Sequence, residues 1–193
     1  MLQKNWGLNC RKMPEHVYEF INGRKVTKRE FLRWFEKKFL YILRKFHMIE
    51  KGDLVIWENK KDFRGVVLED LLEMFAEKAP IELVKDKKGK YTKKAISSSS
   101  NTEGTGIIKN IIKGKAKDMN KFAPVDGKII KPLYLFLDKE IKLYADLKDL
   151  KYKKFKEKSS NKDEKILKFL EDMESKHPEL RYSIIQSYLE ISK

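Results

Sequence analysis

The chain has 193 residues, of which 41% are hydrophobic and 38% are charged, and its basic residues exceed its acidic residues by 44 − 29 = 15. The hydrophobic share is enough for a real core, and the length suits one domain or one domain with a small appendage. The basic excess favours a polyanionic partner, RNA or DNA rather than a membrane, although a lysine-rich proteome would give the same balance for solubility alone.

The cysteine content and the hydropathy pattern exclude further classes. Cys10 is the only cysteine, so the chain has neither a disulfide framework nor a cysteine-based cluster. No apolar run is long enough to span a bilayer, and residues 1–14 lack the apolar segment of a signal peptide. We therefore expect a cytoplasmic protein without a membrane partner.

The first predicted elements are a hairpin and a long helix. Asn22-Gly23 lies between strand-like flanks, which predicts a β-hairpin. Thr27 followed three residues later by Glu30 is a capping-box pattern and predicts a helix start. An apolar stripe then continues to Ile49 before Gly52 ends the segment, while basic residues occupy the other side: Lys37, Lys38, Arg44 and Lys45.

The stretch from Lys51 to Phe75 combines a strand, a charged loop and a helix. Residues 54–57 form a short apolar run typical of a buried strand, and apolar residues recur at helical spacing over 63–75. This order opens a nucleotide-binding α/β unit, in which phosphates lie at the helix N-terminus. The intervening loop, residues 58–62, contains no glycine, so its composition does not suit a phosphate.

The middle of the chain alternates strands and helices. Residues 81–84 predict a second strand, and Ala95-Ile96 with the four serines that follow predicts the end of a third strand, although a serine run also suits a linker. A helix is predicted from about Glu103 to Lys113, and Gly114 ends it. Its expected apolar face consists of Ile107, Ile108, Ile111 and Ile112. Residues 115–127 are expected to form a loop.

The last third predicts a strand end and three helices. Ile129-Ile130 is strand-like, Asp138 is predicted to cap a helix, and Pro178 is predicted to start the final helix after one around residues 166–173. Strands alternating with helices predict an α/β fold, a parallel sheet of about four strands with helices on both faces.

Four stretches resemble one known family. Residues 30–53 resemble its aromatic helix and first strand, and residues 97–114 its helix ending in N-I-L-R-G. Residues 128–145 are the closest match, to R-I-K-P-L followed by E-K-E-I-x-x-Y-A, and residues 176–183 resemble the start of its C-terminal helix. The chain thus resembles the PP-loop ATP-dependent tRNA 2-thiolation sulfurtransferases of the TtuA/TtcA group.

This resemblance implies a truncated Rossmann-like fold of the adenine nucleotide alpha-hydrolase type. Residues 1–50 are expected to form the N-terminal hairpin and aromatic-rich helix. Residues 51–193 are expected to form a reduced PP-loop-like α/β domain with C-terminal helices, in which the segment between Lys78 and Ala95 is much shorter than in the family.

The family's nucleotide loop is degenerate here. Its S-G-G-K-D-S motif falls on Glu58, Asn59, Lys60, Lys61, Asp62 and Phe63. Only Lys61 and Asp62 match, and the lost glycines would have let backbone amides wrap a pyrophosphate. Glu58 adds a carboxylate where an anion should lie. The family's paired aspartates fall on Asn101 and Thr102, so a carboxylate for metal binding or catalysis is missing.

The family's sulfur chemistry also lacks its residues. Two of its three cysteines lie in the shortened region, and the third falls near Lys158, where there is no cysteine. The zinc ribbon of the TtuA branch needs paired ligands, whereas Cys10 is followed by Met13. We therefore expect no catalytic residues, no metal and no cofactor.

Two lysine stretches interleaved with aromatic residues are the candidate RNA contacts. Ammonium groups neutralise phosphates, and aromatic rings stack on unpaired bases, although lysine runs are often simply solvated. The candidates are Lys85, Lys87, Lys88, Lys90, Lys93, Lys94, Lys151, Lys153, Lys154, Lys156 and Lys158.

The resemblance and the charge together favour a non-catalytic paralogue of a tRNA 2-thiolation enzyme. Such a protein would bind tRNA or another structured RNA, support an active thiolation enzyme, or associate with itself. Two alternatives stay open: a protein-interaction module with no RNA role, and a residual nucleotide-dependent transferase or hydrolase that uses Lys61 and Asp62.

Overall fold

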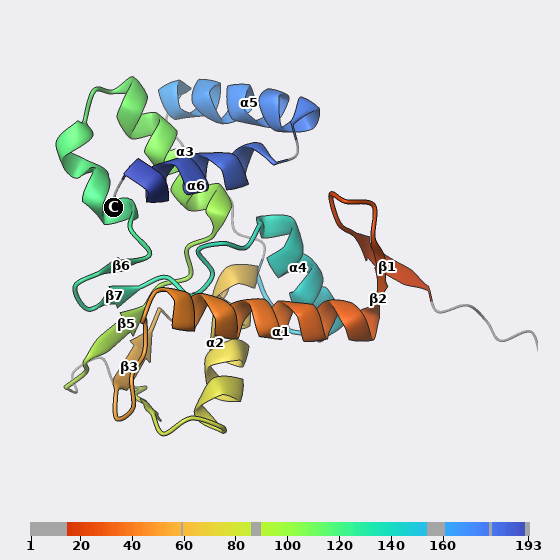
Figure 1. The fold of residues 1–193 in the computed structure, drawn as a ribbon, viewed down its shortest axis with the longest axis vertical. Helices are drawn as coiled ribbons and strands as arrows, with labels where there is room; N and C mark the ends of the chain where they lie inside the picture. Colours follow the sequence, from red (N-terminus) through yellow and green to blue (C-terminus); the bar gives the residue numbers. More distant parts are fainter. Residues whose placement is uncertain (1–14, 59, 86–89, 154–160, 178, 192–193) are drawn as a thin grey trace, which may run out of the picture.

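The computed structural model describes residues 15–58, 60–85, 90–153, 161–177 and 179–191. Its centre is a five-stranded sheet in the order β4-β3-β5-β7-β6 (Figure 1). The strands in that order are β4 (Glu82–Leu83), β3 (Leu54–Trp57), β5 (Lys93–Ala95), β7 (Ile129–Ile130) and β6 (Val125–Asp126). All neighbouring pairs are parallel except β6 and β7, which are antiparallel.

Helices cover both faces of this sheet. The helix α2 (Phe63–Ala76) connects β3 to β4, and α3 (Ser100–Ile112) connects β5 to β7 in the opposite direction across the sheet. Because parallel crossovers are right-handed, α2 and α3 must lie on opposite faces. The helix α4 (Asp138–Leu147) packs against α2 and against α1 (Lys28–Lys45) (Figure 1). The helices α5 (Asn161–Lys176) and α6 (Leu180–Ile191) pack against α3. The predicted α/β class is confirmed.

The N-terminal hairpin and the start of α1 also agree with the prediction. Strands β1 (His16–Glu19) and β2 (Lys25–Thr27) are antiparallel, and Gly23 has a φ of +77° in the turn between them. The Glu30 carboxylate accepts from the Thr27 backbone N–H at 2.9 Å, which completes the capping box. This backbone hydrogen bond, with that of the Thr27 hydroxyl, lowers the pKa of Glu30.

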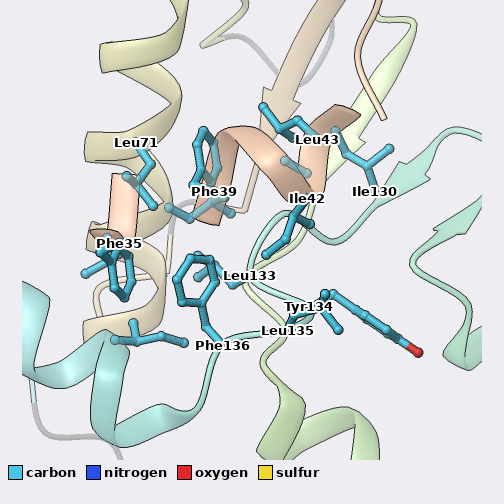
Figure 2. Packing of buried hydrophobic residues seen from close by; sticks show 14 of the residues in the cluster. Phe35, Phe39, Ile42, Leu43, Leu71, Ile130, Leu133, Tyr134, Leu135 and Phe136 are labelled. Atoms are coloured by element: carbon cyan, nitrogen blue, oxygen red, sulfur yellow. The ribbon is translucent and has the colours of Figure 1, made fainter. Parts of the chain in front are cut away.

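The main core lies between α1, α2, α4 and the segment before α4. Figure 2 shows Phe35, Phe39 and Ile42 of α1 gathered with Leu71 of α2 and Phe136. The Phe35 ring centroid lies 4.1 Å from that of Phe136 and 4.3 Å from that of Tyr144 in α4. The apolar stripe predicted on the long helix therefore packs as expected.

Helix ends differ from the sequence prediction in two places. The helix α1 ends at Lys45 rather than continuing to Ile49, because His47 adopts a left-handed conformation with a φ of +47°. The helix α3 begins at Ser100, three residues before the predicted start, because the Ser99 side chain caps it. Its predicted apolar face is partly wrong, since Ile111 and Ile112 are each 60% exposed in a last turn that extends beyond the packing.

Three further predictions need correction. Residues 115–127 contain the 3₁₀ helix η1 (Ala116–Phe122) and β6 instead of an unstructured loop. Asp138 does not cap α4: it is the first helical residue, and its carboxylate binds Arg64. The helix α6 begins at Leu180, and Pro178 lies outside the described residues. None of the described helices combines the length and the hydropathy needed to cross a membrane.

Candidate functional site: the switch-point pocket

A pocket of about 600 Å³ lies at the carboxyl ends of β3 and β5. It is lined by Glu58 and residues 60–62 of the loop after β3, by the first two residues of α2, by residues 96–98 after β5, by Thr102, by Lys142 of α4 and by residues 152–153. Because the connections from β3 and β5 run in opposite directions, this is the topological switch point of the sheet, where ligands of open α/β folds bind. We refer to it as the switch-point pocket.

The loop after β3 folds back onto the first turn of α2. Gly65 lies so close to Lys60 that a Cβ atom at Gly65 would be 2.1 Å from the Lys60 carbonyl oxygen, so only glycine fits here without a backbone shift. The Asp62 Oδ1 accepts from the Gly65 N–H at 2.7 Å and caps the helix. The Asp62 carboxylate therefore already accepts from an N–H at the positive end of α2, and the Lys60 carbonyl lies close to the same turn.

Glu58 does not leave an isolated negative charge in the pocket. Its carboxylate lies 2.9 Å from Lys60 Nζ, and its backbone N–H donates to the Ala95 carbonyl at 3.1 Å. Five of the six predicted loop residues line the pocket: Glu58 and the four residues from Lys60 to Phe63. The sixth, Asn59, lies outside the described residues.

The four serines after β5 are all buried, and Ser97 and Ser98 form part of the pocket wall. Ser99 caps α3, Ser98 Oγ donates to the Glu103 carboxylate, and Ser100 Oγ donates to the Tyr134 carbonyl at 2.8 Å. Ser97 differs, because its Oγ has no hydrogen-bond partner among the described residues although the residue is only 5% exposed. The serine run is neither a linker nor part of a strand, since β5 ends at Ala95.

A buried ion pair between Lys131 and Glu103 holds Ser98, which lines the pocket. Lys131 Nζ lies 2.7 Å from Glu103 Oε2 and donates to the Lys121 carbonyl at 2.6 Å. Glu103 in turn accepts from Ser98, which lines the pocket. The pair therefore fixes the position of one wall of the pocket.

The basic side chains that line the pocket differ in whether they form an ion pair. Arg64 forms a bidentate ion pair with Asp138 that connects α2 to α4. Its Nε lies 2.8 Å from Oδ1 and its Nη2 lies 2.6 Å from Oδ2. Lys61, Lys142 and Lys153, in contrast, form no ion pair with any residue that the structure describes. The Lys153 N–H donates to the Lys61 carbonyl at 2.7 Å, so these two lysines are held near each other.

The structure thus brings together parts of the two predicted residue sets, the nucleotide loop and the second lysine stretch. In the same place, the Phe63 and Tyr152 rings meet edge to face at 6.2 Å. Arg64 and Lys142 were not predicted: Arg64 adjoins the predicted loop, but nothing in the sequence around Lys142 signals that α4 reaches this pocket.

The first lysine stretch lies elsewhere. Lys93 and Lys94 are half-buried within β5, and Lys90 precedes the amino end of that strand, whereas the pocket lies at its carboxyl end. Lys85 follows β4 and Lys151 is exposed next to Tyr152. The remaining RNA candidates lie outside the described residues: Lys87, Lys88, Lys154, Lys156 and Lys158.

Comparisons with known proteins find a structural relative. No protein-family model matches the chain, and no curated protein sequence matches it. Among solved structures, the U34-tRNA thiolase NcsA from Methanococcus maripaludis, with its [4Fe-4S] cluster, superposes with a TM-score of 0.74. The match has 17% sequence identity and covers 94% of this chain and 86% of that chain. The chain therefore has the Rossmann-like α/β fold of a U34-tRNA thiolase.

Proposed function

We propose that this chain is a non-catalytic relative of the tRNA 2-thiolation enzymes that binds tRNA or another structured RNA at the switch-point pocket. The observation that carries the proposal is the composition of that pocket. It offers three lysines without described ion-pair partners, Lys61, Lys142 and Lys153, beside a helix end that the Asp62 carboxylate already caps. An active thiolation enzyme is the protein partner that we propose for such a chain.

A nucleotide triphosphate suits this pocket poorly. Phosphate loops bind anions through a row of free backbone N–H groups, for which glycines leave space. Here Asp62 accepts from the first turn of α2, and the Lys60 carbonyl lies against Gly65. An incoming triphosphate would have to displace the Asp62 carboxylate from the Gly65 N–H, in a loop that has no glycine to expose further N–H groups. We therefore expect no productive ATP binding.

An iron–sulfur cluster does not suit these residues either. Such clusters are held by several cysteine thiolates, and the 193 residues contain one cysteine, Cys10. Within the described residues, no group of three or more histidine, cysteine, aspartate or glutamate side chains is arranged to hold a metal ion. The proposed function therefore involves no step at a cluster.

RNA, in contrast, suits the lysines of the pocket. Each lysine that neutralises a phosphate releases a counterion, so the affinity depends on salt in proportion to the number of contacts. The exposed loops of tRNA also supply unpaired bases on which Tyr152, at the pocket wall, could stack.

We expect the variant Lys61→Gln/Lys142→Gln/Lys153→Gln to bind an unmodified tRNA transcript more weakly than the parent. With some five phosphate contacts, log K of the parent should fall with log salt at a slope of roughly −3.5 to −4.5. Loss of three contacts should flatten that slope by about 2.1 to 2.7. Fluorescence anisotropy across a salt series measures both quantities.

The matched control is Lys78→Gln/Lys165→Gln/Lys168→Gln, which removes the same charge from exposed positions away from the pocket. It should keep the parental slope. Equal slopes for the pocket variant and the parent would show that the pocket is not the RNA site. Absence of binding by the parent at low salt would reject RNA binding altogether and favour the protein-interaction module.

A further inference from the structure

The outer face of α1 carries a line of basic residues that the switch-point pocket does not use. A helix turns 100° per residue, so the buried residues Phe31, Phe35 and Phe39 define the inner face. The basic residues project from the opposite side and are all exposed. We call this set the α1 basic face, and it consists of Arg29, Arg33, Lys37 and Arg44.

An open groove lies beside the α1 basic face. It has a volume of about 620 Å³ and is lined by Arg33 and Lys37 of α1, by Arg24 from the hairpin turn, and by two aromatic rings. Tyr41 is 50% exposed, and the Trp34 and Phe20 rings meet edge to face with their centroids 4.8 Å apart. The groove therefore combines three cations with aromatic surface.

The other charged residues of the groove are already engaged. Glu30 completes the capping box with Thr27, and Lys38 lies 3.0 Å from Glu140, where burial lowers the pKa of Lys38 against the opposing effect of Glu140. Among the described residues, no carboxylate forms an ion pair with Arg29, Arg33 or Lys37. Glu30 is the one carboxylate among the described residues that line the groove, so positive charge exceeds negative charge there.

Helix stability does not account for these cations. Arg29 lies in the first turn of α1, where the helix dipole disfavours positive charge. Arg29, Arg33 and Lys37 follow one another at a spacing of four residues, and like charges at that spacing destabilise a helix. Only Arg44, in the last turn, complements the dipole. A basic line that weakens its own helix points to a binding role.

We propose that the α1 basic face binds the phosphate backbone of RNA; this inference rests on the proposed function but concerns a second surface. A spacing of four helical residues corresponds to about 6 Å, similar to the separation of successive phosphates along a strand. Arginine can bind each phosphate through two N–H groups, and Tyr41 can stack on an unpaired base. Regularly spaced cations suit the regularly spaced charges of a phosphate backbone, whereas charged residues are depleted in the core of protein–protein interfaces.

The test compares Arg33→Gln/Lys37→Gln with the control Lys165→Gln/Lys168→Gln, which removes the same charge from exposed positions on α5. Binding of an unmodified tRNA transcript is measured from about 0.1 M to 1 M salt. The α1 variant should flatten the salt slope by about 1.4 to 1.8, which corresponds to a loss of affinity of about 25- to 60-fold at 0.1 M salt relative to 1 M. The control should keep the parental slope.

The outcomes separate this inference from the proposed function. A parental slope in Arg33→Gln/Lys37→Gln, together with a flattened slope in the Lys61/Lys142/Lys153 variant, overturns the α1 basic face alone. An equal loss in the α5 control shows that only net charge matters and also overturns it. Absence of parental binding at low salt overturns both. A flattened slope in the α1 variant alone supports this face even if the pocket contributes nothing.

Discussion

The substitution Lys131→Met is expected to lower the free energy of unfolding by about 3–5 kcal/mol, a large part of the stability of an ordinary domain. Lys131 and Glu103 are only 4% and 5% exposed, and their charged atoms lie 2.7 Å apart. Removing the ammonium group leaves the Glu103 carboxylate in the interior without its cation. The Lys121 carbonyl also loses its donor, at 2.6 Å in the parent.

Urea denaturation followed by circular dichroism measures this loss. The control Lys25→Met breaks an exposed pair with Glu19, at 3.7 Å, and should cost no more than about 1 kcal/mol. The double variant Glu103→Leu/Lys131→Met should recover part of the loss, because no buried charge is left alone. The recovery is only partial, because removing Glu103 takes away the acceptor of the Ser98 hydroxyl. If Lys131→Met is as mild as Lys25→Met, the buried pair does not support the pocket wall.

The substitution Phe35→Ala should also lower the free energy of unfolding by about 3–5 kcal/mol. The Phe35 side chain is fully buried and stacks between Phe136 and Tyr144, with centroid distances of 4.1 Å and 4.3 Å. Truncation removes these aromatic contacts and leaves a cavity between α1 and α4 that rigid neighbours cannot fill. Because α4 carries Lys142, a loosened α4 should also weaken RNA binding at the pocket.

Chemical denaturation of Phe35→Ala and of the intermediate Phe35→Leu gives the size of the effect. Tyr41→Ala is the matched control: it removes an aromatic ring from the same helix, but at a position that is 50% exposed. A surface truncation of this kind should change stability by about 0.5 kcal/mol or less. A Phe35→Ala variant as stable as Tyr41→Ala would contradict the packing shown in Figure 2.

Local patterns predicted the elements whose signals lie within a few residues. Asn22-Gly23 gave the hairpin turn, Thr27 with Glu30 gave the start of α1, and the apolar run before the charged loop gave β3. The same rules failed where distant residues decide the conformation. Asp138 is a residue type that often caps helices, but its carboxylate binds Arg64, which is 74 residues away in the sequence.

The serine run, residues 97–100, shows the same limit of prediction from local sequence. Four consecutive serines suggest exposure, yet Ser98 and Ser100 are buried because Glu103 and the Tyr134 carbonyl satisfy their hydroxyl groups. In the reverse case, Ile111 looks like a core residue but lies in a helix turn that nothing covers among the described residues. Polarity alone could not distinguish these cases, because the partners come from other elements.

The candidate site was predictable in part. Residues after β3 and β5 could be expected to meet, because the carboxyl ends of adjacent parallel strands share one edge of the sheet. Lys142 could not be placed there, since its position depends on how α4 packs on α2. The α1 basic face was visible as a polar side of the helix, but the groove requires Arg24 of the hairpin to fold against it.

We propose that the switch-point pocket does not bind a nucleotide and that its lysines bind RNA. A calorimetric titration of the parent protein with ATP and Mg²⁺ separates this proposal from a nucleotide-dependent enzyme. We expect no saturable heat up to millimolar ATP, because Asp62 already caps the first turn of α2 and the loop before it has no glycine to expose N–H groups. A well-defined isotherm at micromolar ATP that disappears in Lys61→Ala would contradict the proposal and favour a nucleotide-dependent enzyme.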